Sequence, residues 1–170
     1  MDLYLLLQSI QHLSPYLTNL YIQDWDISLK KSVDKLLLQM PDLKNFTIVG
    51  NGLGNQAFCN LPKVFAQERS NENKLDLKFN NIFIPDTDTL VYLLGSLNKV
   101  AEGTKIHLSL NIRNKINVNL LVDKLCEFFQ RGKSKGVISI EICDKKINTK
   151  CLNRLEDAVQ NSSISAKLKV

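Results

Sequence analysis

The sequence predicts an α/β solenoid of about five repeats, with a parallel sheet on its concave side and helices on its convex side. Three observations predict this fold. Short segments of alternating apolar residues recur along the chain at broadly regular intervals. The intervals between them carry apolar residues at helical spacing. Polar stretches punctuated by Gly separate the two kinds of element, and strands that are joined through helices run parallel.

Length and composition are compatible with one folded domain over residues 1–170. The chain is 44% hydrophobic and 23% charged, as in soluble globular proteins. It contains no continuous apolar run long enough to span a membrane. Its first residues, MDLYLLLQSIQHL, lack the basic start of a signal peptide. We expect a cytoplasmic protein, located in the host cytosol if it is an exported bacterial protein.

Two segments carry the strand pattern most completely. Residues 43–53, LKNFTIVGNGL, fit L-x-x-L-x-L-x-x-N-x-L, with Phe46 at the second position and Ile48 at the third. Residues 75–82, LDLKFNNI, give L-x-L-x-x-N-x-I. Alternation of this kind points every second side chain into a core. Both segments are therefore predicted to be strands of the same sheet.

Two further segments keep the apolar frame but replace the Asn. Residues 17–27, LTNLYIQDWDI, carry Trp25 at the Asn position. Residues 137–147, VISIEICDKKI, carry Lys145 there. Each is predicted to be a strand whose exit turn differs from that of the two complete segments.

The remaining strands are predicted from partial matches. Residues 106–116, IHLSLNIRNKI, match the end of the repeat pattern, with Asn114 at the Asn position. Before Asn114, the apolar residues lie one position away from where the pattern requires them, which predicts a bulge or a longer strand. The last residues, ISAKLKV, can supply a final strand with Leu168 and Val170 inward. Each of the six predicted strands then has a third apolar position, and these positions are Ile22, Ile48, Leu77, Leu110, Ile142 and Val170. Successive positions are 26, 29, 33, 32 and 28 residues apart.

The intervals between strands predict amphipathic helices. Apolar residues spaced three and four apart lie on one helix face. The sets are Val33, Leu36, Leu37 and Met40; Phe58, Leu61 and Phe65; Leu90, Leu93, Leu94, Leu97 and Ala101; Leu121, Leu125, Phe128 and Phe129; and Leu152, Leu155 and Val159. Predicted N-caps are Ser28, Asn55, Asp86, Asn117 and Asn148, and Pro41, Gly103 and Gly132 follow predicted helix ends.

The repeated pattern resembles the leucine-rich-repeat family, in its ribonuclease-inhibitor-like subtype with helices on the convex side. The resemblance covers roughly residues 14–170. Similar irregular repeats rich in Asn and Lys occur in NOD-like receptors and in bacterial effector proteins. The resemblance implies an N-terminal capping helix over residues 1–16, repeats over residues 17–170 and stacking that makes one continuous core.

No motif in the sequence predicts catalysis, a cofactor or a metal site. The cysteines Cys59, Cys126, Cys143 and Cys151 lack C-x-x-C spacing, and His12 and His107 lie far from them. We expect reduced thiols that pack as small apolar groups. The GNGLG segment lacks the full spacing of a phosphate loop. We therefore expect a binding protein rather than an enzyme.

The predicted function is recognition of a partner protein through the concave strand face. Residues that alternate with the core positions should form that face. They are Tyr21, Gln23, Thr47, Val49, Asp76, Lys78, Ser109, Asn111, Glu141, Cys143, Lys167 and Lys169, with Trp25 either in the interface or filling the place of the missing Asn.

Two alternatives stay open. Residues 131–170 hold nine basic and four acidic residues, a difference equal to the whole net charge of +5. That basic end could bind nucleic acid or acidic lipid, although it lacks interleaved aromatic residues and offers only Arg131 and Arg154 for bidentate phosphate contacts. The chain could also be the non-catalytic recognition part of a larger enzyme or receptor.

Overall fold

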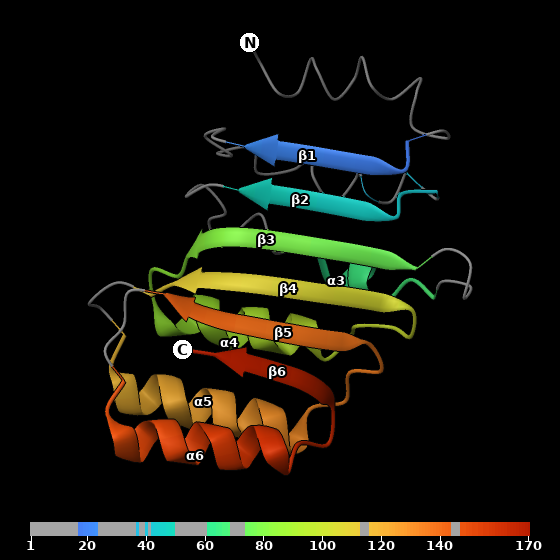
Figure 1. Ribbon diagram of the computed structural model, residues 1–170. Helices are drawn as coiled ribbons and strands as arrows, with labels where there is room; N and C mark the ends of the chain where they lie inside the picture. The colour runs from blue at the N-terminus through green and yellow to red at the C-terminus, as the bar shows by residue number, and fades with distance from the viewer. Residues whose placement is uncertain are drawn as a thin grey trace.

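The computed structural model describes residues 17–23, 37, 40, 42–49, 61–68, 74–112, 116–143 and 147–170. Within these residues the chain forms one sheet of six strands, and four helices (Figure 1). The predicted capping helix over residues 1–16 lies outside the described residues, as do Trp25, Lys145 and Asn114.

All six strands are parallel and follow one another in the sheet in chain order. This arrangement confirms the parallel sheet that the alternating segments predict. The strands are β1 (Asn19–Gln23), β2 (Asn45–Val49), β3 (Leu75–Phe83), β4 (Thr104–Asn111), β5 (Val137–Cys143) and β6 (Ser165–Lys169).

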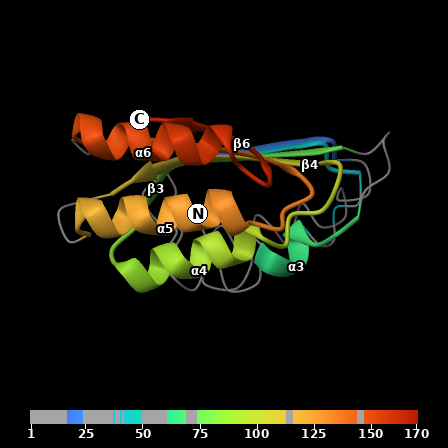
Figure 2. The ribbon, with the colours of Figure 1, turned by 90° about the horizontal axis from the view of Figure 1, so that it is seen from below.

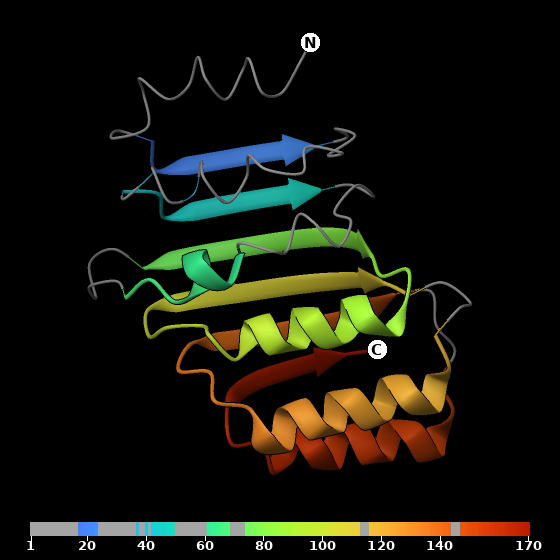
Figure 3. The same cartoon turned by 180° about the vertical axis from the view of Figure 1, so that it is seen from behind.

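The helices lie between the strands along the chain and gather on one side of the sheet. They are α3 (Leu61–Phe65), α4 (Thr87–Leu97), α5 (Val118–Arg131) and α6 (Thr149–Gln160). The helices α3, α4 and α5 cover the face of the sheet that is turned away from the viewer in Figure 1, and α6 lies beside α5 at the β6 edge (Figures 2 and 3). None of these four helices lies in front of the sheet in Figure 1.

Inward side chains of neighbouring strands are in register and form continuous rows. One row comprises Leu20, Phe46, Leu77, Ile106, Ile138 and Ala166, and the next comprises Ile22, Ile48, Phe79, Leu108, Ile140 and Leu168. The predicted pairings of Ile22 with Ile48 and of Leu110 with Ile142 are confirmed.

The predicted register of β3 is wrong by two residues against β2 and by four residues against β4. Leu77 pairs with Phe46 and Ile106 rather than with Ile48 and Leu110. The partner of Ile48 is Phe79. Alternation has a period of two, so it fixes the face on which a side chain lies but cannot distinguish registers that differ by two residues. Each β3 side chain therefore remains on its predicted face.

A β-bulge lies in β3, where this strand pairs with β4. The register with β4 shifts between Phe79 and Ile82, and Asn81 has a φ of 57°. Asn tolerates this left-handed conformation better than most residues. β4 itself alternates without interruption over eight residues, so the expected longer strand is confirmed and the bulge lies in its neighbour.

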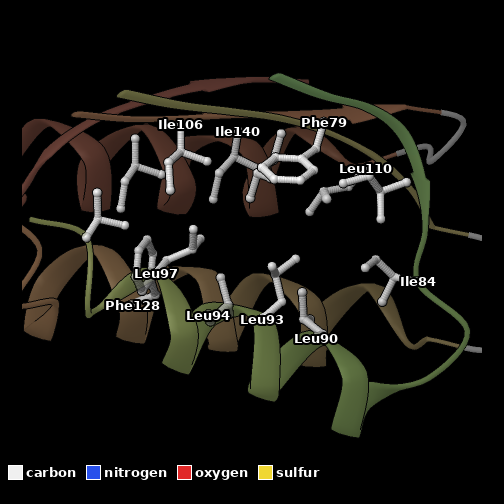
Figure 4. Close-up of a cluster of buried hydrophobic side chains, with 14 of the residues drawn as sticks. Phe79, Ile84, Leu90, Leu93, Leu94, Leu97, Ile106, Leu110, Phe128 and Ile140 are labelled. Carbon is white, nitrogen blue, oxygen red and sulfur yellow. The ribbon is translucent and has the colours of Figure 1, made fainter. Parts of the chain in front are cut away.

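The core lies between the sheet and the helices. Inward side chains of the strands, such as Phe79, Leu110 and Ile140, meet Leu93 of α4 and Phe128 of α5 (Figure 4). At the β2–β3 end, the ring of Phe79 packs edge-on against Phe46 and Phe65, with centroids 6.1 and 6.4 Å apart. Apolar burial of this kind is the main force that stabilises the fold.

Three helices begin at the predicted caps. The side-chain oxygens of Asp86, Asn117 and Asn148 accept hydrogen bonds from the backbone N–H of Thr89, Asn119 and Cys151, respectively. These bonds satisfy donors that a helix start leaves unpaired. The predicted caps Ser28 and Asn55, like Pro41, lie outside the described residues. Gly132 follows α5, and Gly103, with φ 80°, lies in the turn before β4.

Burial differs from expectation at the C-terminal end of the sheet. Val170 is 47% exposed and follows β6 rather than facing the core, because β6 ends at Lys169. In α6 the fully buried positions are Cys151, Leu155 and Ala158, whereas Leu152 and Val159 flank them and are half-buried.

Within the described residues, every helix is too short or too polar to cross a membrane.

Candidate interaction face of the sheet

The side chains that point away from the helices form what we call the open face. Register aligns them in rows across the strands. One row is Asn19, Asn45, Asp76, Lys105, Val137 and Ser165; the next is Tyr21, Thr47, Lys78, His107, Ser139 and Lys167; and a third, interrupted by the bulge, is Gln23, Val49, Asn80, Ser109, Glu141 and Lys169. Every one of these residues is half-buried or exposed.

At the β1–β2 end the open face carries neutral polar groups and one large aromatic ring. The Nδ2 of Asn45 donates to the Oδ1 of Asn19 across the two strands at 2.7 Å. The hydroxyl of Tyr21 donates to the Oε1 of Gln23 at 2.8 Å. Tyr21 is 61% exposed, the largest exposed fraction among the large hydrophobic residues of the described chain. An aromatic ring held in this way offers contact area with little rotamer freedom left to lose.

Charged groups meet at the centre of the open face. The Oδ1 of Asp76 lies 3.6 Å from the Nε2 of His107, and its Oδ2 lies 4.0 Å from the Nζ of Lys78. Asp76 Oδ1 is buried and accepts no hydrogen bond from a described residue. Neighbouring groups cover this oxygen, so a molecule that docks on the open face does not reach it, and its described neighbour is the His107 imidazole.

The β4–β6 end of the open face carries more basic than acidic side chains. The side chain of Lys169 donates a hydrogen bond to Glu141 across β5 and β6, and this bond raises the pKa of Lys169. Lys105 and Lys167 lie exposed in the neighbouring rows. The Ser109 hydroxyl lies 3.1 Å from the Cys143 thiol, in hydrogen-bond contact. Beside it, Asn111 donates to the Oδ1 of Asn81 in the bulge at 3.2 Å.

Twelve of the thirteen residues predicted for the interface lie on this one face, and Trp25 lies outside the described residues. The prediction missed further members of the same face. They are Asn19, Asn45, Asn80, Phe83, Lys105, His107, Val137, Ser139 and Ser165. Strict alternation along each whole strand would have identified most of them, because the prediction used only the positions next to one inward residue.

The described cysteines are divided between the two sides of the sheet. Cys143 is half-buried on the open face, whereas Cys126 and Cys151 are buried in α5 and α6. Burial raises the pKa of the Cys126 thiol, which lies 3.6 Å from the backbone oxygen of Arg154. Within the described ranges, no three His, Cys, Asp or Glu side chains are grouped closely enough to hold a metal ion. Cys59 lies outside those ranges.

Comparison of the chain with protein-family models, with curated proteins and with solved structures finds no match.

Proposed function

We propose that the chain is a leucine-rich-repeat protein that binds a partner protein on the open face of its sheet. The observation that carries the proposal is the arrangement of the strands. Six parallel strands follow in chain order while the helices between them gather on one side. Solenoid proteins are built by stacking such strand–helix units, and they use the extended strand face for binding.

The spacing of the strands also supports a repeat. Asn45 of β2 follows its partner Asn19 of β1 by 26 positions, and Lys169 of β6 follows its partner Glu141 of β5 by 28. A leucine-rich repeat runs over about 20–29 residues. Two intervals are slightly longer than this range: Asp76 of β3 follows its partner Asn45 of β2 by 31 positions, and Val137 of β5 follows its partner Lys105 of β4 by 32. The polar segment 131–136 accommodates the extra length between β4 and β5.

The chemistry of the open face favours a protein as the partner. Its rows mix neutral polar groups, an exposed aromatic ring and charges of both signs. Protein interfaces combine aromatic anchors with a polar surround in this way.

Site-specific photo-crosslinking tests the proposal. A photoreactive amino acid placed at Thr47 or at Ser139, both on the open face, should crosslink to a protein in an extract of the native cell or host. Placed at Glu156, which is exposed on α6, it should not. Crosslinks from Glu156 alone would contradict binding through the open face.

The affinities of variants for the captured protein show which residues contribute more to binding. Tyr21→Ala should weaken binding about 30-fold, the loss typical of an aromatic hot spot. Joint replacement of Lys145, Lys146, Lys167 and Lys169 by Ala should weaken it less, because peripheral charges act mainly on the association rate. A nucleic-acid binder would reverse this order, and its logarithmic salt dependence would flatten by roughly 0.9 for each phosphate that the variant no longer neutralises.

A further inference from the structure

The helices α4 and α5 lie side by side (Figures 2 and 3), and residues of both line a groove. Its volume is about 230 Å³, and the buried side chains of Leu94 and Phe128 form its floor. Gly95 of α4 and Arg131 of α5 line its walls. Small-molecule pockets usually measure roughly 300–1,000 Å³ and enclose their ligand, so this open groove suits the side chains of a protein better.

Gly95 has no role that packing within the described chain explains. It is an exposed residue within α4, and its backbone is not in the left-handed region that favours glycine. A Cβ atom added at Gly95 would meet no atom within 4 Å. Glycine weakens a helix relative to alanine. The absence of a side chain at Gly95 therefore leaves open space beside the backbone of α4.

Exposed apolar side chains lie on α4, within one turn of this glycine, and on α5. Val91 and Tyr92 of α4 are 44% and 43% exposed, and Leu120 of α5 is 38% exposed. Leu120 lies four residues before Lys124, which lines the groove, so it extends the same face of α5. Apolar side chains that cluster on a surface, rather than being scattered singly, mark an interaction site.

Opposite charges lie at the two ends of the exposed stripe of α4. Asp88 is in the first turn, and Lys99 comes directly after the C-cap Asn98. Arg131 of α5 lines the groove together with Asn98. Helical spacing places Asp88, Tyr92, Gly95 and Lys99 on one face. Within the part of the chain that the structure describes, none of these three charged side chains is in an ion pair.

We propose that this stripe packs against the same stripe of a second copy of the chain, with the two α4 helices antiparallel about a twofold axis. Twofold symmetry places residue i against j and j against i. The acidic end of each α4 then meets the basic end of the other, and the Val91 and Tyr92 side chains of one copy enter the groove at Gly95 of the other. The absent side chain at Gly95 lets the two helices approach closely.

The expected dimer is weak and leaves the open face accessible. α4 has 11 residues, so the shared area is small, as in transient complexes. The groove lies on the side of the sheet opposite the open face. Dimerisation therefore does not depend on the proposed binding of a partner protein, and either can fail without the other.

Sedimentation of the purified full chain, from micromolar to near-millimolar concentration, tests the dimer. The unaltered chain should show a reversible monomer–dimer equilibrium. Gly95→Arg should remain monomeric with unchanged circular dichroism, since Arg favours a helix more than Gly does. Asn153→Arg, an equivalent change at an exposed position of α6, should dimerise like the unaltered chain. A monomer at every concentration, or undiminished association of Gly95→Arg, overturns the proposal.

Charge exchange tests the antiparallel geometry separately. Asp88→Lys should weaken association about tenfold, because each dimer then contains two like-charge contacts in place of two ion pairs. Lys99→Asp combined with Arg131→Asp should have a similar effect. All three changes together should restore association. The antiparallel arrangement is overturned if this combined variant associates more weakly than Asp88→Lys alone and more weakly than the variant with Lys99→Asp and Arg131→Asp.

Discussion

The two faces of the same six strands differ in both chemistry and burial. On the helical side, Phe46, Leu77 and Ile106 are fully buried in one apolar row. On the open face, the neighbouring row runs from Tyr21 through Lys78 to Lys167, and its members are half-buried or exposed. Adjacent residues of one strand thus have unrelated roles. The helical side stabilises the fold, whereas the open face can vary in sequence without loss of the core.

Truncation of inward side chains should give the largest effects. Phe79→Ala should lower the free energy of unfolding by roughly 3–5 kcal/mol, because it removes the ring that packs against Phe46 and Phe65. Leu77→Ala and Ile142→Ala should each cost about 2–5 kcal/mol, since both side chains are buried. Urea denaturation measures these losses. Midpoints close to that of the unaltered chain would show that the inward row is misplaced.

Removal of a helix cap should have an intermediate effect. Asp86→Ala deletes the carboxylate that accepts hydrogen bonds from the N–H and the hydroxyl of Thr89 at the start of α4. We expect a loss of about 1 kcal/mol in urea denaturation, whereas Asp86→Asn should retain most of the stability. Equal losses for the two variants would mean that the cap hydrogen bond is not what stabilises this helix.

Changes on the open face should have the smallest effect on folding. Lys78→Ala should change the free energy of unfolding by no more than about 0.5 kcal/mol, because its contact with Asp76 is 4.0 Å long and solvent-exposed. The same denaturation series provides the measurement. A loss comparable to that of Leu77→Ala, one residue away, would abolish the distinction between the faces.

The faces and the element types could be predicted because each depends on local periodicity. Alternation placed Asp76 and Lys78 on the open face even though their pairing partners were predicted wrongly. The caps Asp86, Asn117 and Asn148 could be identified because each polar residue immediately precedes an amphipathic stripe.

Features that depend on contacts between strands could not be predicted. The choice of Phe79 rather than Leu77 as the partner of Ile48 depends on how the aromatic rings of β2, α3 and β3 pack together. The bulge at Asn81 was not predicted, because the sequence of β3 keeps its alternating pattern up to Phe79 and nothing in it marks the residue at which the pairing with β4 shifts. The groove beside Gly95 arises only when α4 and α5 lie side by side.

The sequential strand order has a consequence for how the chain folds. Every described strand pairs with the strand that comes next along the chain. The pairing of two strands therefore closes only the segment between them, which keeps the loss of conformational entropy modest. Folding can begin at the central strands, because their inward side chains are buried. It can then spread outward to one neighbouring strand at a time. At the edges, β1 buries only Ile22 and β6 buries none of its residues. Unravelling from either edge can therefore proceed while β3, β4 and β5 remain folded.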